Sequence, residues 1–155
     1  MTPGLSALPA SGSSPLVTAV IAIAVALLAS SLIAVAIKSK SGKLRAGPGG
    51  ADEAQAPPGI ALSATGPTIV HFSAVWCGPC AAVRRVVDQV SAEQPEVAHI
   101  EVDIDANPDA ARTLSVLSLP TTFIFDASGR QAYRVSGVPK AADLRTALQG
   151  LTQPG

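Results

Sequence analysis

Residues 16–37 form a run of 22 residues without a charged side chain, LVTAVIAIAVALLASSLIAVAI. As a helix this run would be roughly 33 Å long, which is enough to cross the hydrocarbon core of a bilayer. Its polar members, Thr18, Ser30 and Ser31, can donate their hydroxyls to carbonyls of the same helix. A buried core helix is usually shorter and apolar on one face only. We therefore expect a single transmembrane helix over residues 16–37.

A cleaved signal peptide is the alternative interpretation of this run. Ala34-Val35-Ala36 has the small-x-small form of a cleavage site. However, no Lys or Arg precedes the run, and the run is longer than an ordinary signal core. We therefore expect an uncleaved single-pass anchor in the cell membrane.

The orientation of this anchor follows from the charges beside it. No Lys or Arg lies on the N-terminal side, whereas Lys38, Lys40, Lys43 and Arg45 follow the run closely. The positive-inside rule then places the C-terminal part of the chain in the cytoplasm. The alternative is that these residues only contact lipid headgroups, on either side of the membrane.

Composition divides the rest of the chain into three parts. Residues 1–15 carry no charge and are rich in Ser, Gly, Pro and Ala, which predicts a disordered tail. Residues 38–66 contain few large apolar groups and are expected to be a flexible linker. Residues 67–152 are the expected folded domain.

Charge and cysteine content restrict the class of protein. The formal net charge is zero, from 11 basic and 11 acidic residues. No basic stripe alternates with aromatic residues, so we expect no nucleic acid partner. The two cysteines, Cys77 and Cys80, are too close in sequence to build a disulfide-stapled secreted domain. The two cysteines therefore indicate a reactive site rather than a structural disulfide framework.

The folded domain alternates strands and helices in the order β-α-β-α-β-β-α. This order predicts an α/β fold, a mixed sheet with helices on both faces, in which parallel strands joined by right-handed crossovers carry an antiparallel hairpin at the edge. The expected strands are residues 68–73, 97–103, 121–125 and 131–135, and the expected helices are residues 77–93, 108–116 and a C-terminal segment that ends near Leu151.

The two cysteines lie where the first of these strands runs directly into a helix, at Trp76-Cys-Gly-Pro-Cys80. A helix N-terminus that begins at Cys77 would favour its thiolate, the attacking species in disulfide exchange. Cys80 could then reach the sulfur of Cys77 and resolve a mixed disulfide. Trp76 could flank the exposed sulfur in a docking surface, or it could simply be a packing residue.

Other uses of this cysteine pair are weaker. A zinc site needs four ligands, and the chain has only one such pair besides His71 and His99. A c-type haem needs a histidine directly after the second cysteine, where the chain has Ala81. A purely structural disulfide is improbable at an exposed strand–helix junction. We therefore expect no metal and no cofactor.

The motif resembles the active site of the thioredoxin family. The bare pair of cysteines would be a weak signal, and other segments add to it. The resemblance covers roughly residues 67–151, and its further parts are the segment Leu119-Pro120-Thr121, residues 103–108, Gly129 and Gly137.

The resemblance implies a role for each matching residue. Cys77 would be the nucleophile and Cys80 the resolving thiol, and the two would form a redox-active disulfide. Pro120 would be cis and face the cysteines, and Leu119 would offer backbone hydrogen bonds to a bound substrate. From the sequence alone a trans proline has the larger prior, so this expectation depends on the resemblance.

Two departures from the family pattern concern the protons of the site, and a third concerns the helix. His71 stands where the family has a buried aspartate that accepts the proton of the resolving cysteine. It is a candidate proton acceptor, or it only fills the inner face of its strand. Glu101 stands where the family has a lysine, so the two charges could be exchanged. Arg85 replaces a helix-kinking proline. The first strand and helix of the family are poorly represented.

These observations predict a membrane-anchored thiol–disulfide oxidoreductase that reduces disulfides of protein clients and receives electrons from a thiol donor. The Gly-Pro pair between the cysteines is typical of reducing family members. One alternative is an extracytoplasmic protein of the cytochrome c maturation type, which requires the opposite orientation in the membrane. The other alternative is a redox-responsive binding module with little turnover.

Overall fold

A computed structural model describes residues 14–40, 42–47, 56–57 and 59–152 of the chain. The chain divides into two compact units, residues 1–39 and residues 40–155, and each is described by itself. Most of the segment expected as a disordered tail lies outside the described residues.

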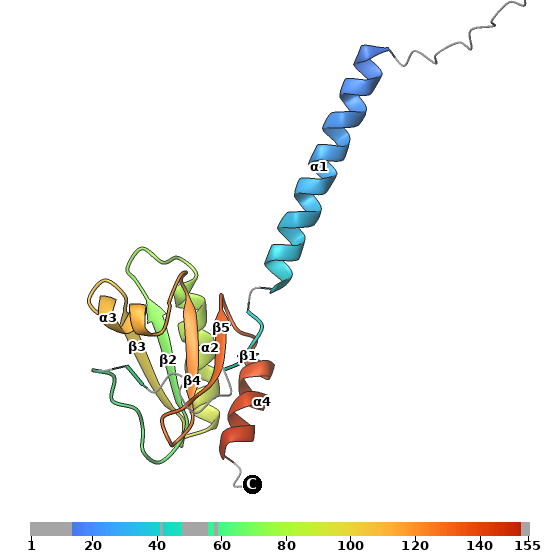
Figure 1. Ribbon diagram of the computed structural model, residues 1–155. Helices are drawn as coiled ribbons and strands as arrows, with labels where there is room; N and C mark the ends of the chain where they lie inside the picture. Colours follow the sequence, from blue (N-terminus) through green and yellow to red (C-terminus); the bar gives the residue numbers. More distant parts are fainter. Residues whose placement is uncertain (1–13, 41, 48–55, 58, 153–155) are drawn as a thin grey trace, which may run out of the picture. The chain divides into compact units, whose positions relative to one another are not determined.

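The first unit is a helix, α1, which runs from Pro15 to Lys40 without a break (Figure 1). The segment Pro15–Ala36 is long and apolar enough to cross a membrane, with a mean hydropathy of 2.7 and no buried residue. The hydroxyl of Ser30 donates to the carbonyl of Ala26 at 2.8 Å, so the helix itself accommodates this polar side chain. A signal sequence near the N-terminus can meet the same criteria of length and hydropathy.

The second unit is built on a five-stranded sheet in the order β1-β5-β4-β2-β3. The interior strand β2, Thr68–Ser73, pairs in parallel with β3, Ala98–Asp103. On its other side it pairs antiparallel with β4, Thr121–Phe125. The hairpin partner β5, Gln131–Ser136, and the short β1, Arg45–Ala46, complete the sheet. All six residues of β2 are buried, as expected for an interior strand.

The direction of β4 corrects the expectation that parallel pairing would continue beyond β3. The intervening helix α3, Pro108–Thr113, has six residues and is about 9 Å long. A strand of six residues spans about 20 Å, so this helix cannot carry the chain back across the sheet. The chain instead re-enters the sheet at the end where β3 leaves it, and β4 runs antiparallel to β2.

Helices cover both faces of this sheet, as the sequence predicts (Figure 1). One face carries α2, Cys80–Glu93, and α4, Ala141–Thr152, whose apolar residues share one core cluster with Ile69 of β2. The opposite face carries α3 and a second cluster that contains Val70 and Phe72 of the same strand. Because side chains alternate along a strand, His71 lies on the face of Ile69, beneath α2.

The structure corrects part of the expected linker, residues 38–66. The part of this segment that ends at Gly47 pairs with β5. The N–H of Gly42 donates to the carbonyl of Ser136 at 2.7 Å, and β1 then pairs antiparallel with β5. Further on, Ile60 and Leu62 pack against the α3-side core. An edge strand has unpaired backbone groups, and this segment satisfies those of β5. These residues therefore belong to the folded unit.

Candidate functional site

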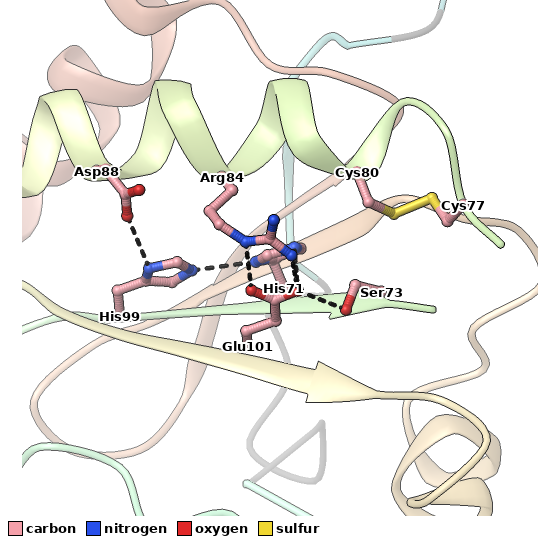
Figure 2. Close-up of polar contacts among 8 residues, drawn as sticks. All are labelled: His71, Ser73, Cys77, Cys80, Arg84, Asp88, His99 and Glu101. Carbon is pink, nitrogen blue, oxygen red and sulfur yellow. Dashed lines mark hydrogen bonds and ion pairs between the residues drawn. A yellow bond between two sulfur atoms is a disulfide. The ribbon is translucent and has the colours of Figure 1, made fainter. Parts of the chain in front are cut away.

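The two cysteines are joined by a disulfide at the end of β2 that leads into α2 (Figure 2). Their Cα atoms are 5.5 Å apart. The N–H of Cys77 donates to the carbonyl of Ala74, and the N–H of Cys80 donates to the carbonyl of Cys77. Cys80 is buried and 2% exposed, whereas Cys77 is partly exposed. An incoming disulfide can therefore reach the first sulfur but not the second.

The start of α2 differs from the expectation that the helix would begin at Cys77. The helix begins at Cys80, and Pro79 is its N-cap residue. A residue before proline is disfavoured in the helical region, so Gly78 cannot continue a helix toward Cys77. Cys77 thus lies in a turn ahead of the helix. The free N–H groups and positive end of the helix still favour a thiolate there.

Trp76 lies on the surface beside this turn, with 67% of its area exposed. Its indole N–H donates to a carboxylate oxygen of Asp105 at 3.0 Å. Asp105 belongs to the loop that follows β3, where the Asp103 side chain accepts the N–H of Asp105. This contact fixes the indole between two loops without burying it, which disfavours the interpretation of Trp76 as a core packing residue.

The peptide bond between Leu119 and Pro120 is cis, which confirms the expectation from the family resemblance. Pro120 is buried, and its carbonyl accepts the N–H of Gly137 at 2.8 Å. In the antiparallel register, Phe72 pairs with Thr121. One further step along both strands brings Pro120 to the end of the sheet where β2 runs into the cysteine turn.

His71 is completely buried beneath α2. Its Nδ1 atom lies 3.0 Å from Nε2 of His99, and the two rings stack with centroids 5.3 Å apart. Its Nε2 atom lies 3.8 Å from a carboxylate oxygen of Glu101. Burial lowers the pKa of His71 to about 4, because desolvation penalises the imidazolium more than the nearby Glu101 charge favours it. His71 is therefore neutral at pH 7.

The predicted approach of His71 and Glu101 is confirmed, but the main partner of Glu101 is a residue that the sequence did not suggest. The guanidinium of Arg84 binds both carboxylate oxygens, at 2.8 and 2.5 Å. The hydroxyl of Ser73 donates to the same carboxylate at 2.7 Å. The hydrogen bonds from Arg84 lower the pKa of Glu101 to about 2, and the hydrogen bond from Ser73 adds to this effect. Glu101 thus stays ionised.

Ser73, Arg84 and Asp88 were not singled out from the sequence, and His99 was considered only as a metal ligand. Figure 2 shows them with His71 and Glu101 between α2 and the strands β2 and β3. One signal was present: Cys80, Arg84 and Asp88 are spaced four residues apart and share one side of a helix. Pairing His99 with His71 additionally requires the β2–β3 register, which the sequence does not specify. We call His71, Ser73, Arg84, Asp88, His99 and Glu101 the buried polar cluster, after its two buried members, His71 and Ser73.

Comparisons with known proteins agree with this geometry. The family model "Thioredoxin" matches residues 60–150. A thioredoxin of Mycolicibacterium smegmatis is 43% identical over 88 residues, which cover 54% of this chain and 78% of that protein. A bifunctional thioredoxin reductase/thioredoxin of Mycobacterium leprae is 40% identical over 86 residues, 54% of this chain and 19% of that protein. A solved mutant thioredoxin from Halobacterium salinarum is similar with a TM-score of 0.52 and 31% identity, over 57% of this chain and 77% of that chain.

Proposed function

The chain belongs to the thioredoxin family and is a thiol–disulfide oxidoreductase, and from this premise we propose that it is a membrane-anchored reductase of protein disulfides. The observation that carries the proposal is the asymmetry of the cysteine pair. Cys77 is partly exposed in a turn ahead of a helix N-terminus, and Cys80 is buried behind it.

This asymmetry assigns a separate step to each thiol. The thiolate of Cys77 attacks one sulfur of a client disulfide, and the other client sulfur leaves as a thiolate. Cys80 then loses its proton and attacks the sulfur of Cys77. The mixed disulfide breaks, the second client thiolate leaves, and the Cys77–Cys80 disulfide remains. Two electrons thus pass from the dithiol to the client, and His71 is the candidate acceptor for the proton of Cys80.

The proposed docking surface for clients surrounds the exposed sulfur. Val75 and Trp76 are 96% and 67% exposed on one side of the turn. The cis bond at Leu119-Pro120 lies at the same end of the sheet, where the backbone of Leu119 would bind an extended client segment. Backbone recognition of this kind accepts many sequences, so a range of protein clients is expected.

The electron donor is proposed to be a thiol protein of the reductase type. Support comes from the Mycobacterium leprae relative, whose name joins a thioredoxin reductase with a thioredoxin. Two thiolates of the donor would reduce the Cys77–Cys80 disulfide by the same two exchange steps in reverse.

The membrane anchor is proposed to be α1, with the folded unit in the cytoplasm. The basic residues that follow the apolar segment support this orientation. Protease treatment of intact cells tests it: a cytoplasmic domain is protected until the membrane is opened. Digestion from outside would contradict this orientation and favour the extracytoplasmic alternative, and a chain that washes off the membrane would contradict the anchor itself.

The reductase activity is tested with a single substitution, Cys77→Ser. We expect complete loss of insulin disulfide reduction, because Cys80 is too buried to attack a client itself. The matched control is Ser128→Ala, a change of similar size in the exposed turn between β4 and β5. Full reduction by Cys77→Ser would contradict the proposal. Wild-type protein that binds partners but does not turn over would favour a redox-responsive binding module.

A further inference from the structure

The buried polar cluster contains a contact between two imidazole rings that the thiol chemistry described so far does not use. Nδ1 of His71 lies 3.0 Å from Nε2 of His99. A hydrogen bond of this kind holds one proton, so one ring donates and the other accepts. The neutral pair therefore has two arrangements, which differ by the position of a proton on each ring.

The outer end of this pair reaches the surface. Nδ1 of His99 lies 3.5 Å from a carboxylate oxygen of Asp88 on α2. The side chain of His99 is 18% exposed and that of Asp88 is 62% exposed, whereas that of His71 is 0% exposed. A proton on His99 can therefore exchange with solvent, which a proton on His71 cannot do directly.

The inner end of the pair lies on the side of the resolving thiol. Among the described residues, no atom makes a hydrogen bond to Nε2 of His71. Cys80 and Val83 occupy the buried side of α2, and Val83 packs in the same core cluster as Ile69. His71 follows Ile69 on the same face of β2, one step closer to the cysteine turn. Figure 2 shows Cys80 and His71 in the same layer between helix and sheet.

From this arrangement we propose that His71 and His99 form a proton path between the thiol of Cys80 and the surface at Asp88. The inference rests on the proposed reductase function and adds a role for His99, which is a positioning and relay residue because it does not touch the reacting sulfur atoms.

The burial of His71 explains why a single imidazole would be a poor acceptor for the proton of Cys80. The pKa of His71 is lowered to about 4, so a protonated ring is strongly disfavoured at neutral pH. With a partner, the ring can accept a proton at Nε2 while its Nδ1 proton moves to His99. Once His99 has released its own Nδ1 proton to solvent, both rings are neutral again and neither leaves a charge in the buried layer.

The other neighbours of His71 do not provide an equivalent route for a proton to solvent. Glu101 faces it from β3, but hydrogen bonds from Arg84 lower the pKa of this carboxyl to about 2, so it does not carry a proton near pH 7. Arg84 on α2 is a permanent cation. Thr122 of β4, which is paired with His71 across the sheet, is uncharged. Besides these residues, the titratable groups that act on His71 are His99 and Asp88, which make up the path itself.

The proposed step balances in both directions of the redox cycle. During resolution, Cys80 gives its proton to Nε2 of His71, directly or through one water molecule, and its sulfur attacks Cys77. His71 passes its Nδ1 proton to Nε2 of His99, which releases its own Nδ1 proton at Asp88 to solvent. When a thiol donor reduces the disulfide, the protons move in the opposite direction. Neither ring has to rotate over a complete cycle.

The test follows the two half-reactions separately in the full-length chain, solubilised in detergent. The reduced protein is mixed with excess chromogenic aromatic disulfide, which releases one coloured thiolate on attack by Cys77 and a second on resolution by Cys80. In His99→Gln we expect an unchanged first phase and a second phase about 10- to 100-fold slower at pH 7. The two proteins should converge at alkaline pH, where hydroxide can take the proton of Cys80 without the two rings.

Two further variants guard against a merely structural effect of the substitution. The surface variant Glu96→Gln, in the loop before β3, should match wild type in both phases. In His99→Ala, added imidazole should restore the second phase without changing the first, because a diffusible base replaces the missing ring.

An unchanged second phase in His99→Gln would overturn the proton path, as would an equal slowing of both phases at every pH. Absence of imidazole rescue in a folded His99→Ala protein would count against it as well. A wild-type protein that releases no thiolate at all would instead overturn the proposed reductase function, so the two failures are distinguishable.

Discussion

The cysteine turn and the buried polar cluster beneath it are specified by the sequence in different ways. In the turn, Trp76, Cys77 and Cys80 lie within five consecutive residues, inside the segment that the thioredoxin family model matches. In the cluster, residues from β2, β3 and α2 meet only after the fold has formed. The residues that exchange disulfides are thus local in the sequence, whereas the residues proposed to carry protons come from three separate elements.

The sharpest way to separate these two regions is the substitution Cys80→Ser. The turn keeps its nucleophile, so we expect one thiolate to be released from an aromatic disulfide at the wild-type rate. Without a resolving thiol, turnover should cease and a stable mixed disulfide should accumulate at Cys77. Mass spectrometry of the intact chain detects this adduct, and continued turnover would contradict the assignment of roles.

The substitution His71→Gln tests the cluster without altering the turn. Glutamine keeps a polar side chain of similar length but cannot accept a proton at neutral pH. We expect resolution of the mixed disulfide to slow by about 100-fold at pH 7, with little change in the first attack. Stopped-flow absorbance measures both phases. Equal rates of resolution in variant and wild type would show that His71 only fills its strand.

The pH dependence of stability provides a further prediction for the same residue. His71 has a folded-state pKa of about 4, below its unfolded value, so the unfolded chain binds more protons between about pH 6.5 and pH 4. The free energy of unfolding should therefore fall by about 2 to 3 kcal/mol as the pH is lowered through this window. Urea titration of the oxidised protein, followed by circular dichroism, measures the change.

His71→Gln is the matched control for that experiment, because it removes the titrating group and should flatten the curve over the same window. Glu101 and His99 also have lowered pKa values, so some decline should remain in the variant. An identical slope in the two proteins would contradict the burial of a neutral His71.

The smallest expected effect concerns the ion pair at the edge of the cluster. In Arg84→Gln the carboxyl of Glu101 loses its main hydrogen-bond donor, so its pKa should rise from about 2 toward the usual range. Resolution at pH 7 should change little, since the carboxyl remains ionised there. Arg85→Gln, an exposed neighbour on the same helix, is the matched control. Carbon NMR of the carboxyl group measures the pKa, and an equal shift in both variants would refute the pairing.

Much of the fold could be predicted from the sequence because its signals are local. The strand at residues 68–73 matches the structure. The cis bond before Pro120 also matches, but it was expected only through the family resemblance. The direction of β4 was missed, since it depends on the short length of α3 rather than on the pattern of either strand. The start of α2 was also predicted wrongly, at Cys77 instead of Cys80. The prediction did not take into account that Pro79 disfavours a helical conformation at Gly78.

For the site, the sequence contains the residues of each contact but does not specify which of them meet. His71 and Glu101 were paired through the family resemblance, whereas His99 was considered only as a metal ligand. The parallel register places His71 opposite Glu101 and brings His99 two residues away on the same face of the sheet. Such a register is fixed by packing across the whole sheet, which no single stretch of sequence encodes.

The proton assignments of the two histidines test the central claim most directly. Nitrogen NMR of the full-length chain, labelled at histidine, identifies which ring nitrogen of His71 carries the proton in the dithiol and disulfide forms. We predict a proton on Nδ1 in the dithiol form and on Nε2 in the disulfide form, where Glu101 lies 3.8 Å away. The same tautomer in both forms, or a charged ring in either at pH 7, would contradict a proton path through this pair.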